Sequence, residues 1–190
     1  SKILSKLKLD KEKYFVVSTH REENIDSEKN FEKIKSIINM LAEDYKIPVV
    51  ISTHPRTKKK LEIKKSKFHS KVNFIKPLGF CDYNKLQIFS KVVLSDSGTI
   101  TEESSILNFP ALNIRETHER PEGMEEASVM MVGLDKFRIK NAISILQSQL
   151  RGDKRTLSLV SDYKVDNVSH KIIRIINSYV DYINREIWKK

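Results

Sequence analysis

The sequence predicts an α/β protein built on a Rossmann-like doubly wound parallel sheet, with a long helix at its C-terminal end. Three observations lead to this prediction. Short runs rich in β-branched and aromatic residues recur along the chain. These runs are separated by stretches whose apolar residues have helical spacing. The stretch 167–190 keeps that helical spacing throughout. Such an alternation of strands and helices predicts βαβ units with right-handed crossovers.

The predicted strands are almost continuously hydrophobic, which is typical of strands buried on both faces of a parallel sheet. The first reads "YFVVST" and a later one reads "VVLSD". Runs of this type cover residues 14–19, 48–53, 72–77, 92–96, 110–115 and 128–133.

The predicted helices lie between and after these runs, at about residues 28–43, 56–67, 82–91, 99–108 and 135–150. Ser27 and Asp135 are suited to cap the first and the last of them, because short polar side chains accept hydrogen bonds from the unpaired amides of a helix start. Residues 151–166 have no clear period, which indicates a loop or short helical turns.

The final stretch predicts a long amphipathic helix, because its apolar residues recur every three or four positions. These residues are Ile172, Ile175, Ile176, Val180, Ile183 and Ile187. We therefore expect a single domain over residues 1–190, with a core at about 14–150 and a helical tail at about 167–188.

Composition indicates a soluble globular chain, since 39% of its 190 residues are apolar. No stretch approaches the roughly 20 apolar residues that span a membrane, and the first residues lack the apolar core of a signal peptide. The single cysteine, Cys81, excludes an internal disulfide and fits a reducing compartment, so we expect a cytoplasmic protein. The first residue is not Met, which indicates a piece of a longer chain.

The chain is basic, with 35 Lys and Arg against 25 Asp and Glu and a formal net charge of +10. Six of the lysines lie in residues 57–67, where Leu61 and Ile63 interrupt them at a spacing that suits a solvated helix face. The charge allows a nucleic-acid partner, but no zinc-finger spacing or ribonucleoprotein aromatic motif accompanies it. A phosphate-bearing small ligand or an acidic partner would suit a basic surface equally well.

Polar residues gather directly after the predicted strands, in the stretches 19–24, 53–56, 78–83, 96–99 and 115–123. In open parallel sheets, ligands bind beyond the carboxyl ends of the strands. This convergence of His, Arg, Asp, Ser and Gly at one sheet edge predicts a binding site there.

The stretch "SDSGTITEESS", residues 95–105, has the composition of an anion-binding helix start. Gly98 permits close backbone approach, and the backbone amides and hydroxyls of Ser97 and Thr99 would meet a phosphate at the positive end of the helix dipole. Thr99 and Glu102 have capping-box spacing. Glu103 is suited to accept hydrogen bonds from the paired hydroxyls of a sugar. The alternative is that the stretch is only a well-capped helix.

Three motifs, "STHREEN", "DSGTITEES" and "RETHERPEG", occur in this order along residues 14–150. In order and spacing they resemble the C-terminal half of the non-hydrolysing UDP-N-acetylglucosamine 2-epimerases. The variant "HERPEGMEEA" is most similar to the branch that makes UDP-N-acetyl-L-fucosamine, from its talosamine epimer, for bacterial capsule and O-antigen.

The resemblance implies a two-domain fold like that of the B-type glycosyltransferases (GT-B), with UDP-sugar in the cleft between the domains. This chain would be the UDP-binding C-terminal domain, without the N-terminal catalytic domain. The family reaction eliminates UDP after loss of the C2 proton and adds it back after reprotonation. Because the carboxylates for that proton transfer lie in the N-terminal half, the chain alone would be an inactive part of an isomerase.

The resemblance also implies partners. The full-length protein would be a homodimer that uses no metal or other cofactor and binds neither nucleic acid nor membrane. In related folds the last helix crosses back to the N-terminal domain. Apolar positions of residues 167–188, Trp188 among them, would then be exposed in this chain and promote self-association.

Site residues follow from the motif positions. His20 would contact the diphosphate or assist the departure of UDP, as the catalytic residue of this half. Ser97 and Gly98 would bind phosphate, Arg120 would stabilise the leaving UDP, and His118 would complete the UDP site. The plainer interpretations are that His20 caps a strand end and that Arg120 pairs with a neighbouring glutamate on a surface loop.

Three further residues would bind the nucleoside. Glu103 would hold the ribose hydroxyls, Tyr83 would stack on uracil, and the backbone at Leu78 would contact the edge of the base. A GT-B glycosyltransferase donor domain, a basic nucleic-acid-binding module and a hydrolysing epimerase remain the alternative functions.

Overall fold

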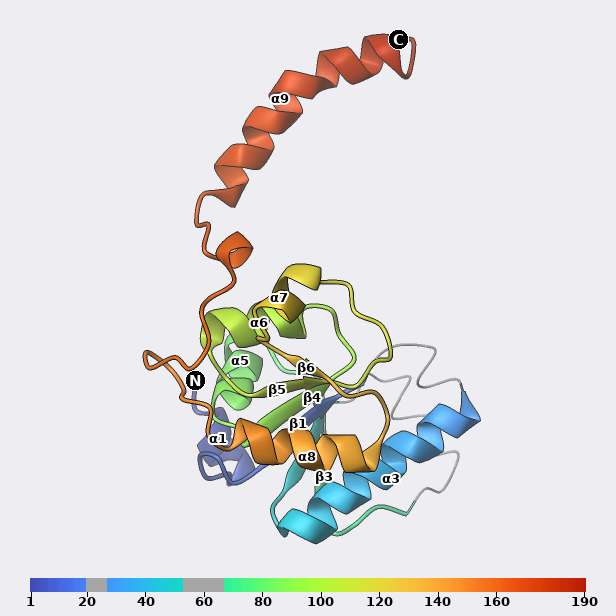
Figure 1. The fold of residues 1–190 in the computed structure, drawn as a ribbon, viewed down its shortest axis with the longest axis vertical. Coiled ribbons are helices and arrows are strands. Elements are labelled where there is room, and N and C mark those ends of the chain that lie inside the picture. The colour runs from blue at the N-terminus through green and yellow to red at the C-terminus, as the bar shows by residue number, and fades with distance from the viewer. Residues whose placement is uncertain (20–26, 53–66) are drawn as a thin grey trace. The chain divides into compact units, whose positions relative to one another are not determined.

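The computed structural model describes residues 1–19, 27–52 and 67–190. It divides into two compact units, Ser1–Val160 and Ser161–Lys190. The first unit is built on a parallel six-stranded sheet in the order β3-β2-β1-β4-β5-β6 (Figure 1). The strands are β1 (Phe15–Ser18), β2 (Val49–Ser52), β3 (Val72–Ile75), β4 (Val92–Ser95), β5 (Ala111–Asn113) and β6 (Met130–Met131). All of the predicted strands are confirmed, and each is shorter than its apolar run.

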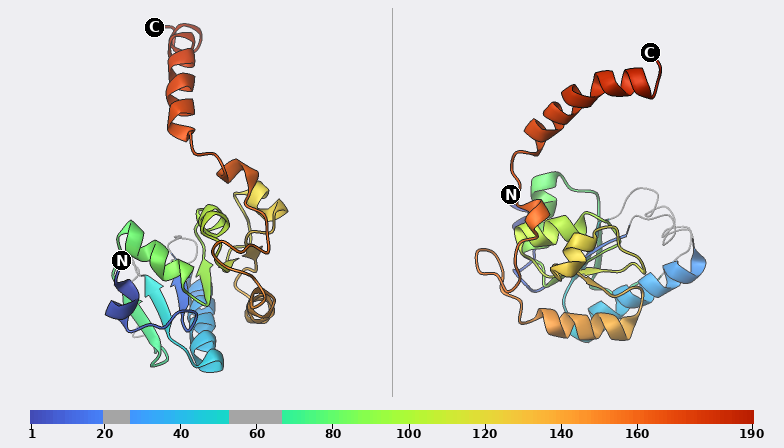
Figure 2. Two further views of the ribbon diagram at one scale, coloured as in Figure 1. Left: turned by 90° about the vertical axis from the view of Figure 1, so that its left-hand side faces the viewer. Right: turned by 45° about the horizontal axis from the view of Figure 1, so that its top comes forward.

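Helices cover both faces of the sheet, as a doubly wound fold requires. α3 (Glu28–Tyr45) and α8 (Lys136–Leu146) lie on one face, while α1 (Ile3–Leu7), α5 (Phe80–Ile88) and α6 (Ile100–Leu107) lie on the other (Figures 1 and 2). α7 (Pro121–Glu125) follows β5. The short helices α1 and α7 were not predicted, since five residues are too few to display a helical period. The predicted helix 56–67 falls almost entirely outside the described residues.

Two hydrophobic clusters explain the continuous apolar runs. Phe15 and Val17 of β1 belong to the cluster that contains α3 and α8, whereas Val16 belongs to the cluster under α5 and α6. Successive side chains of a strand point to opposite faces, so a strand covered on both sides needs apolar residues throughout. The carboxyl ends of three strands depart from this pattern, because the last residue of β1, β2 and β4 is a buried serine.

Two of the predicted helix caps are confirmed. Ser27 Oγ accepts a hydrogen bond from the amide of Asn30 at 3.3 Å, at the start of α3. Asp135 accepts one from the amide of Arg138 at 2.8 Å, at the start of α8. Both helices therefore begin where a short polar side chain satisfies an amide that the helix itself leaves unpaired.

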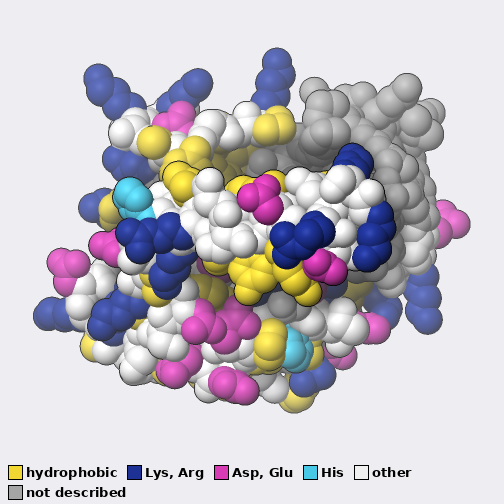
Figure 3. All heavy atoms as spheres, turned by 90° about the horizontal axis from the view of Figure 1, so that it is seen from above, with side chains coloured by type: hydrophobic (Ala, Val, Ile, Leu, Met, Phe, Trp, Pro, Cys, Tyr) yellow, Lys and Arg dark blue, Asp and Glu magenta, His cyan; other side chains and the backbone are white. Residues whose placement is uncertain are grey.

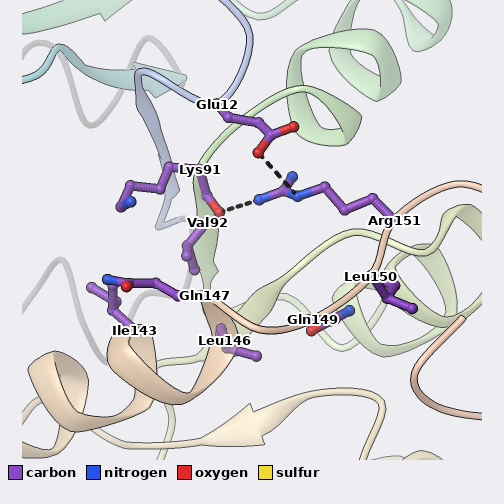
Figure 4. A pocket seen from close by; sticks show the side chains of 9 residues that line it. All are labelled: Glu12, Lys91, Val92, Ile143, Leu146, Gln147, Gln149, Leu150 and Arg151. Carbon is purple, nitrogen blue, oxygen red and sulfur yellow. Dashed lines mark hydrogen bonds and ion pairs between the residues drawn. The ribbon is translucent and has the colours of Figure 1, made fainter. Parts of the chain in front are cut away.

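The segment after α8 is tied to the amino end of β4 by Arg151. Its guanidinium donates to the carbonyl oxygens of Ser90 and Lys91, both at 2.7 Å, and lies 3.7 Å from the carboxylate of Glu12. Burial lowers the pKa of Arg151, and the charge of Glu12 opposes that shift. The hollow of about 310 Å³ that these residues border lies at the edge of the sheet where β4 begins (Figure 4). The Arg151 guanidinium at this hollow is occupied by carbonyl oxygens, which indicates a structural role.

The second unit contains a short 3₁₀ turn (Ser161–Tyr163) and α9 (Val168–Glu186), close to the predicted tail helix. Described by itself, α9 carries one apolar face whose side chains are about half exposed. That face includes Ile172, Ile176, Val180 and, just beyond the helix, Ile187 and Trp188. Over the described ranges, no helix combines the length and the apolarity that crossing a bilayer requires.

Candidate functional site

A cavity of about 310 Å³ opens at the carboxyl edge of the sheet. Ser18, Ser52 and Ser95 form its floor at the ends of β1, β2 and β4, and the segments that follow β3 and β4 supply its walls. The other residues that line it are Pro77, Leu78, Phe80, Tyr83, Gln87, Ser97, Thr99 and Glu103.

The three serines lie side by side, since Ser18 is in register with Ser52 on one side and with Ser95 on the other. Small side chains at adjacent strand ends leave space above the sheet, and their hydroxyls can donate or accept hydrogen bonds. These three serines were not predicted as site residues, because they lie at the ends of predicted strands. Their common signal is that a serine closes three otherwise apolar runs.

The start of α6 borders this cavity through Ser97 and Thr99. The two hydroxyl oxygens lie 3.0 Å apart, and the amide of Ser97 donates to Ser95 Oγ at 3.1 Å. The Ser97 amide is therefore already satisfied, contrary to the expectation that all the amides here would be free for an anion. The helix dipole still presents its positive end at this position.

The predicted capping box of Thr99 and Glu102 is wrong. Thr99 has helical backbone angles and makes no side-chain cap hydrogen bond. Glu102 instead accepts a hydrogen bond from Arg120 Nε at 2.7 Å. A guanidinium is a stronger partner for a carboxylate than a neutral amide, so the ion pair between α6 and the start of α7 replaces the cap.

Glu103 faces the cavity and is held by a neighbour. The carboxamide nitrogen of Gln87 donates to Glu103 Oε2 at 2.7 Å, which joins α5 to α6. Tyr83 lies close to the same carboxylate. Burial raises the pKa of Tyr83, the charges of Glu103 and Asp96 raise it further, and a hydrogen bond with Ser18 opposes the shift. The tyrosine is therefore neutral beside Glu103 at physiological pH.

A second carboxylate lies over the start of α6. A Cβ atom added to Gly98 would stand 2.7 Å from Glu119 Oε2 and 4.0 Å from Arg120 Nη2. The other oxygen of Glu119 lies 3.0 Å from Nη1 of the buried Arg115. The lack of a Cβ at Gly98 thus permits close approach, and in this structure the group that approaches is the carboxylate of Glu119.

The structure brings together half of the predicted site residues. Leu78, Tyr83, Ser97 and Glu103 all line one cavity. Gly98 adjoins it, and Arg120 reaches toward Gly98 while it pairs with Glu102. His118 is exposed on the loop after β5 and is not among the residues that line the cavity. His20 lies outside the described residues.

A metal-binding cluster is not found in the described part of the chain. Across residues 1–19, 27–52 and 67–190, no three His, Cys, Asp or Glu side chains lie where they could hold a metal ion together. What the cavity offers is hydroxyl groups, one carboxylate, the positive end of a helix and apolar walls. Such a set suits a polar organic molecule with hydroxyl groups and an anionic part.

Known proteins share this fold and sequence. The chain is 33% identical to UDP-N-acetylglucosamine 2-epimerase of Methanocaldococcus jannaschii over 145 residues, which is 74% of this chain and 40% of that protein. Among solved structures, UDP-N-acetylglucosamine 2-epimerase of Rickettsia bellii matches all of this chain and 51% of its own, with 45% identity and a TM-score of 0.83. The chain therefore spans about half the length, or less, of these relatives.

Two more structures bear on the fold. The M. jannaschii UDP-GlcNAc 2-epimerase in complex with UDP-GlcNAc and UDP matches 94% of this chain with 28% identity and a TM-score of 0.79. An E. coli heptosyltransferase matches 75% of the chain with 18% identity and a TM-score of 0.53, a likeness of fold alone. The fold is thus the Rossmann-like domain of GT-B-type proteins. Since the UDP-N-acetylglucosamine 2-epimerase family profile also matches residues 1–177, the chain belongs to that family.

Proposed function

We propose that this chain is the UDP-sugar-binding half of a nucleotide-sugar 2-epimerase. The observation that carries the proposal is the cavity that joins Ser97 at the start of α6 to Glu103 and Tyr83. A uracil ring against Tyr83, ribose hydroxyls on Glu103 and a phosphate at Ser97 and Gly98 would use each of these groups for the chemistry it suits. A solved relative, bound to UDP-GlcNAc and UDP, supports the same class of ligand.

The site can stabilise a departing UDP. Cleavage of the bond between the sugar and the diphosphate leaves negative charge on the phosphate oxygens. Arg120 and the amino end of α6 would bind that charge more strongly than they bind the intact substrate, and this difference favours elimination. The ion pair between Arg120 and Glu102 would orient the guanidinium toward such a phosphate. His20 would donate a proton or a hydrogen bond to the same oxygens.

The proton transfer at C2 of the sugar needs acid and base groups that we assign to the other half of the enzyme. The relatives are about twice as long as the matched region, which leaves room for such a domain. We therefore propose that this chain binds UDP but does not by itself catalyse epimerisation, and that full activity requires a partner domain and a homodimer.

The substrate class we propose is the UDP-N-acetyl-L-fucosamine pair of epimers, on the strength of the "HERPEGMEEA" motif at residues 118–127. Its product would serve capsule or O-antigen synthesis in the cytoplasm. The test is epimerisation of each candidate UDP-N-acetylhexosamine by this chain together with its complementing half.

Binding is tested first, by isothermal titration of the chain with UDP, with CMP as the control, at two salt concentrations. We expect saturable UDP binding that is lost in Arg120→Ala and weakened in Glu103→Gln. Absence of UDP binding together with salt-sensitive binding of any polyanion would contradict the proposal and favour a nucleic-acid-binding module.

The net charge of +10 does not by itself select nucleic acid over a small phosphate-bearing ligand. On the face seen in Figure 3, Lys and Arg side chains are interspersed with Asp and Glu, and the residues drawn in colour there do not form a continuous basic stripe. A glycosyltransferase donor domain would bind UDP equally well. It would differ by needing an acceptor for the sugar, so in the epimerisation assay, which contains no acceptor, it would leave the UDP-sugar without its epimer and unconsumed.

A further inference from the structure

Gln87 is one of the most deeply buried polar residues of this protein. It lies near the C-terminal end of α5, its side chain is 1% exposed, and the backbone around it is fixed. Its own carbonyl oxygen accepts a hydrogen bond from Ser90 Oγ at 2.8 Å, and that of the preceding Leu86 accepts one from Tyr14 at 2.7 Å. A polar side chain at such a position is costly unless its polar atoms have partners.

Only one of the two polar atoms of the Gln87 side chain has a hydrogen-bond partner in the described part of the chain. Nε2 donates to Glu103 Oε2 at 2.7 Å, whereas Oε1 is buried and has no hydrogen-bond partner among the described residues. An apolar side chain of the same length would remove the unsatisfied oxygen, but it would also remove the donor. Among the described residues, the one hydrogen bond that the Gln87 side chain makes is therefore the bond to Glu103.

That bond restricts the carboxylate of Glu103. A glutamate side chain has several rotamers of similar energy, and most of them would turn its carboxylate away from any one ligand position. The donor on α5 selects one rotamer and leaves the carboxylate at the cavity wall. We infer that Gln87 is a positioning residue that holds Glu103 in the orientation that binds the ribose hydroxyls of UDP. This inference rests on the proposed function.

The test compares two ligands in one protein. UDP has both ribose hydroxyls, while 2′,3′-dideoxy-UDP has neither and keeps the uracil and the diphosphate. Titration of the full chain with each ligand should show that Gln87→Met weakens UDP binding by at least about tenfold, the lower end of what one hydrogen bond to a charged group contributes. Binding of the dideoxy ligand should be unchanged. A general distortion of the site would weaken both ligands equally, and that result would overturn the inference.

Two further variants make the test independent of folding effects. Gln147→Met makes the same chemical change in the hollow at the opposite edge of the sheet, and it should leave both affinities unchanged. Gln87→Glu places a second carboxylate beside Glu103, so the pair should share a proton with a raised pKa. UDP affinity of Gln87→Glu should then recover as the pH falls below neutrality, which the wild-type chain should not show.

The outcomes separate the two proposals. If the wild-type chain does not bind UDP, the proposed function fails and the inference with it. If the wild-type chain binds UDP more tightly than the dideoxy ligand, but Gln87→Met keeps that preference, only the inference fails. If the preference disappears in Gln87→Met and Gln87→Glu regains it at low pH, Gln87 positions Glu103.

Discussion

Gly123 of the "RPEG" stretch is a glycine for a steric reason that a pair of substitutions can measure. It lies buried in α7, where an added Cβ would overlap Thr101 Cγ2 of α6 and stand 3.3 Å from Ser128 Oγ. Ser128 has little freedom to yield, because its amide and its hydroxyl both donate to the carbonyl oxygen of Gly123, at 3.0 and 3.1 Å. Gly123→Ala should therefore overpack the contact between α6 and α7.

The expected change in unfolding free energy follows from the typical effects of overpacking, helix propensity and apolar burial. Overpacking of a buried site costs about 1–3 kcal/mol of unfolding free energy, of which the better helix propensity of alanine offsets up to about 1 kcal/mol. Thr101→Ser removes the obstructing methyl group, and on its own costs about 0.8 kcal/mol for the buried apolar surface. In the double variant the methyl group lost from residue 101 is replaced by the one gained at residue 123. Its stability should return to within about 0.5 kcal/mol of the wild-type value.

The assay is urea denaturation of all four proteins, followed by circular dichroism. Gly79→Ala is the control for an added Cβ without a steric contact, since a Cβ there meets nothing within 4 Å and the expected cost is only that of alanine at the N-cap of α5. The reasoning is refuted if Gly123→Ala is as stable as the wild-type protein, or if the double variant loses the sum of the two single losses. Either result would mean that α6 and α7 do not approach as closely as the structure has them.

Three other perturbations have defined outcomes. Arg151→Met should lower the unfolding free energy by about 2–4 kcal/mol, because the carbonyl oxygens at the amino end of β4 lose their charged donor. Urea denaturation measures this loss, and a loss below about 0.5 kcal/mol would contradict the prediction. Glu119→Gln should strengthen UDP binding several-fold, since it removes a negative charge from the place proposed for a phosphate. Glu116→Gln is the control, and weaker UDP binding by Glu119→Gln would count against that place for the phosphate. The exposed apolar face of α9 should cause self-association, so sedimentation should show concentration-dependent oligomers that Ile176→Glu suppresses; a chain that is monomeric at high concentration would contradict this.

The sequence predicted the architecture well because the relevant information is local and repeated. A strand covered on both faces needs an unbroken apolar run, and each such run was recognisable without knowledge of its neighbours. Ser27 and Asp135 were recognisable as caps for the same reason. The short helices α1 and α7 were missed because helical period needs length to appear.

The residues of the candidate site were predicted only in part. The wrong or missing predictions concern contacts between segments that are distant along the chain. Thr99 and Glu102 have the spacing of a capping box, but Arg120 lies 18 residues away along the chain and forms the stronger bond with Glu102. Gln87 was not singled out within the predicted helix 82–91, since its partner on α6 becomes apparent only when the two helices are packed together. Local spacing cannot reveal which of several possible partners the fold brings closest.

The strand order divides the sheet along a seam between β1 and β4. β2 and β3 continue from β1 on one side, and β5 and β6 continue from β4 on the other. Ser18 and Ser95 stand across this seam, in register, and both border the cavity. A molecule that contacts both serines would fasten the two halves of the sheet to each other, and its binding energy would oppose their local separation. Amide protons of β1 and β4 should then exchange with solvent more slowly when the cavity is filled.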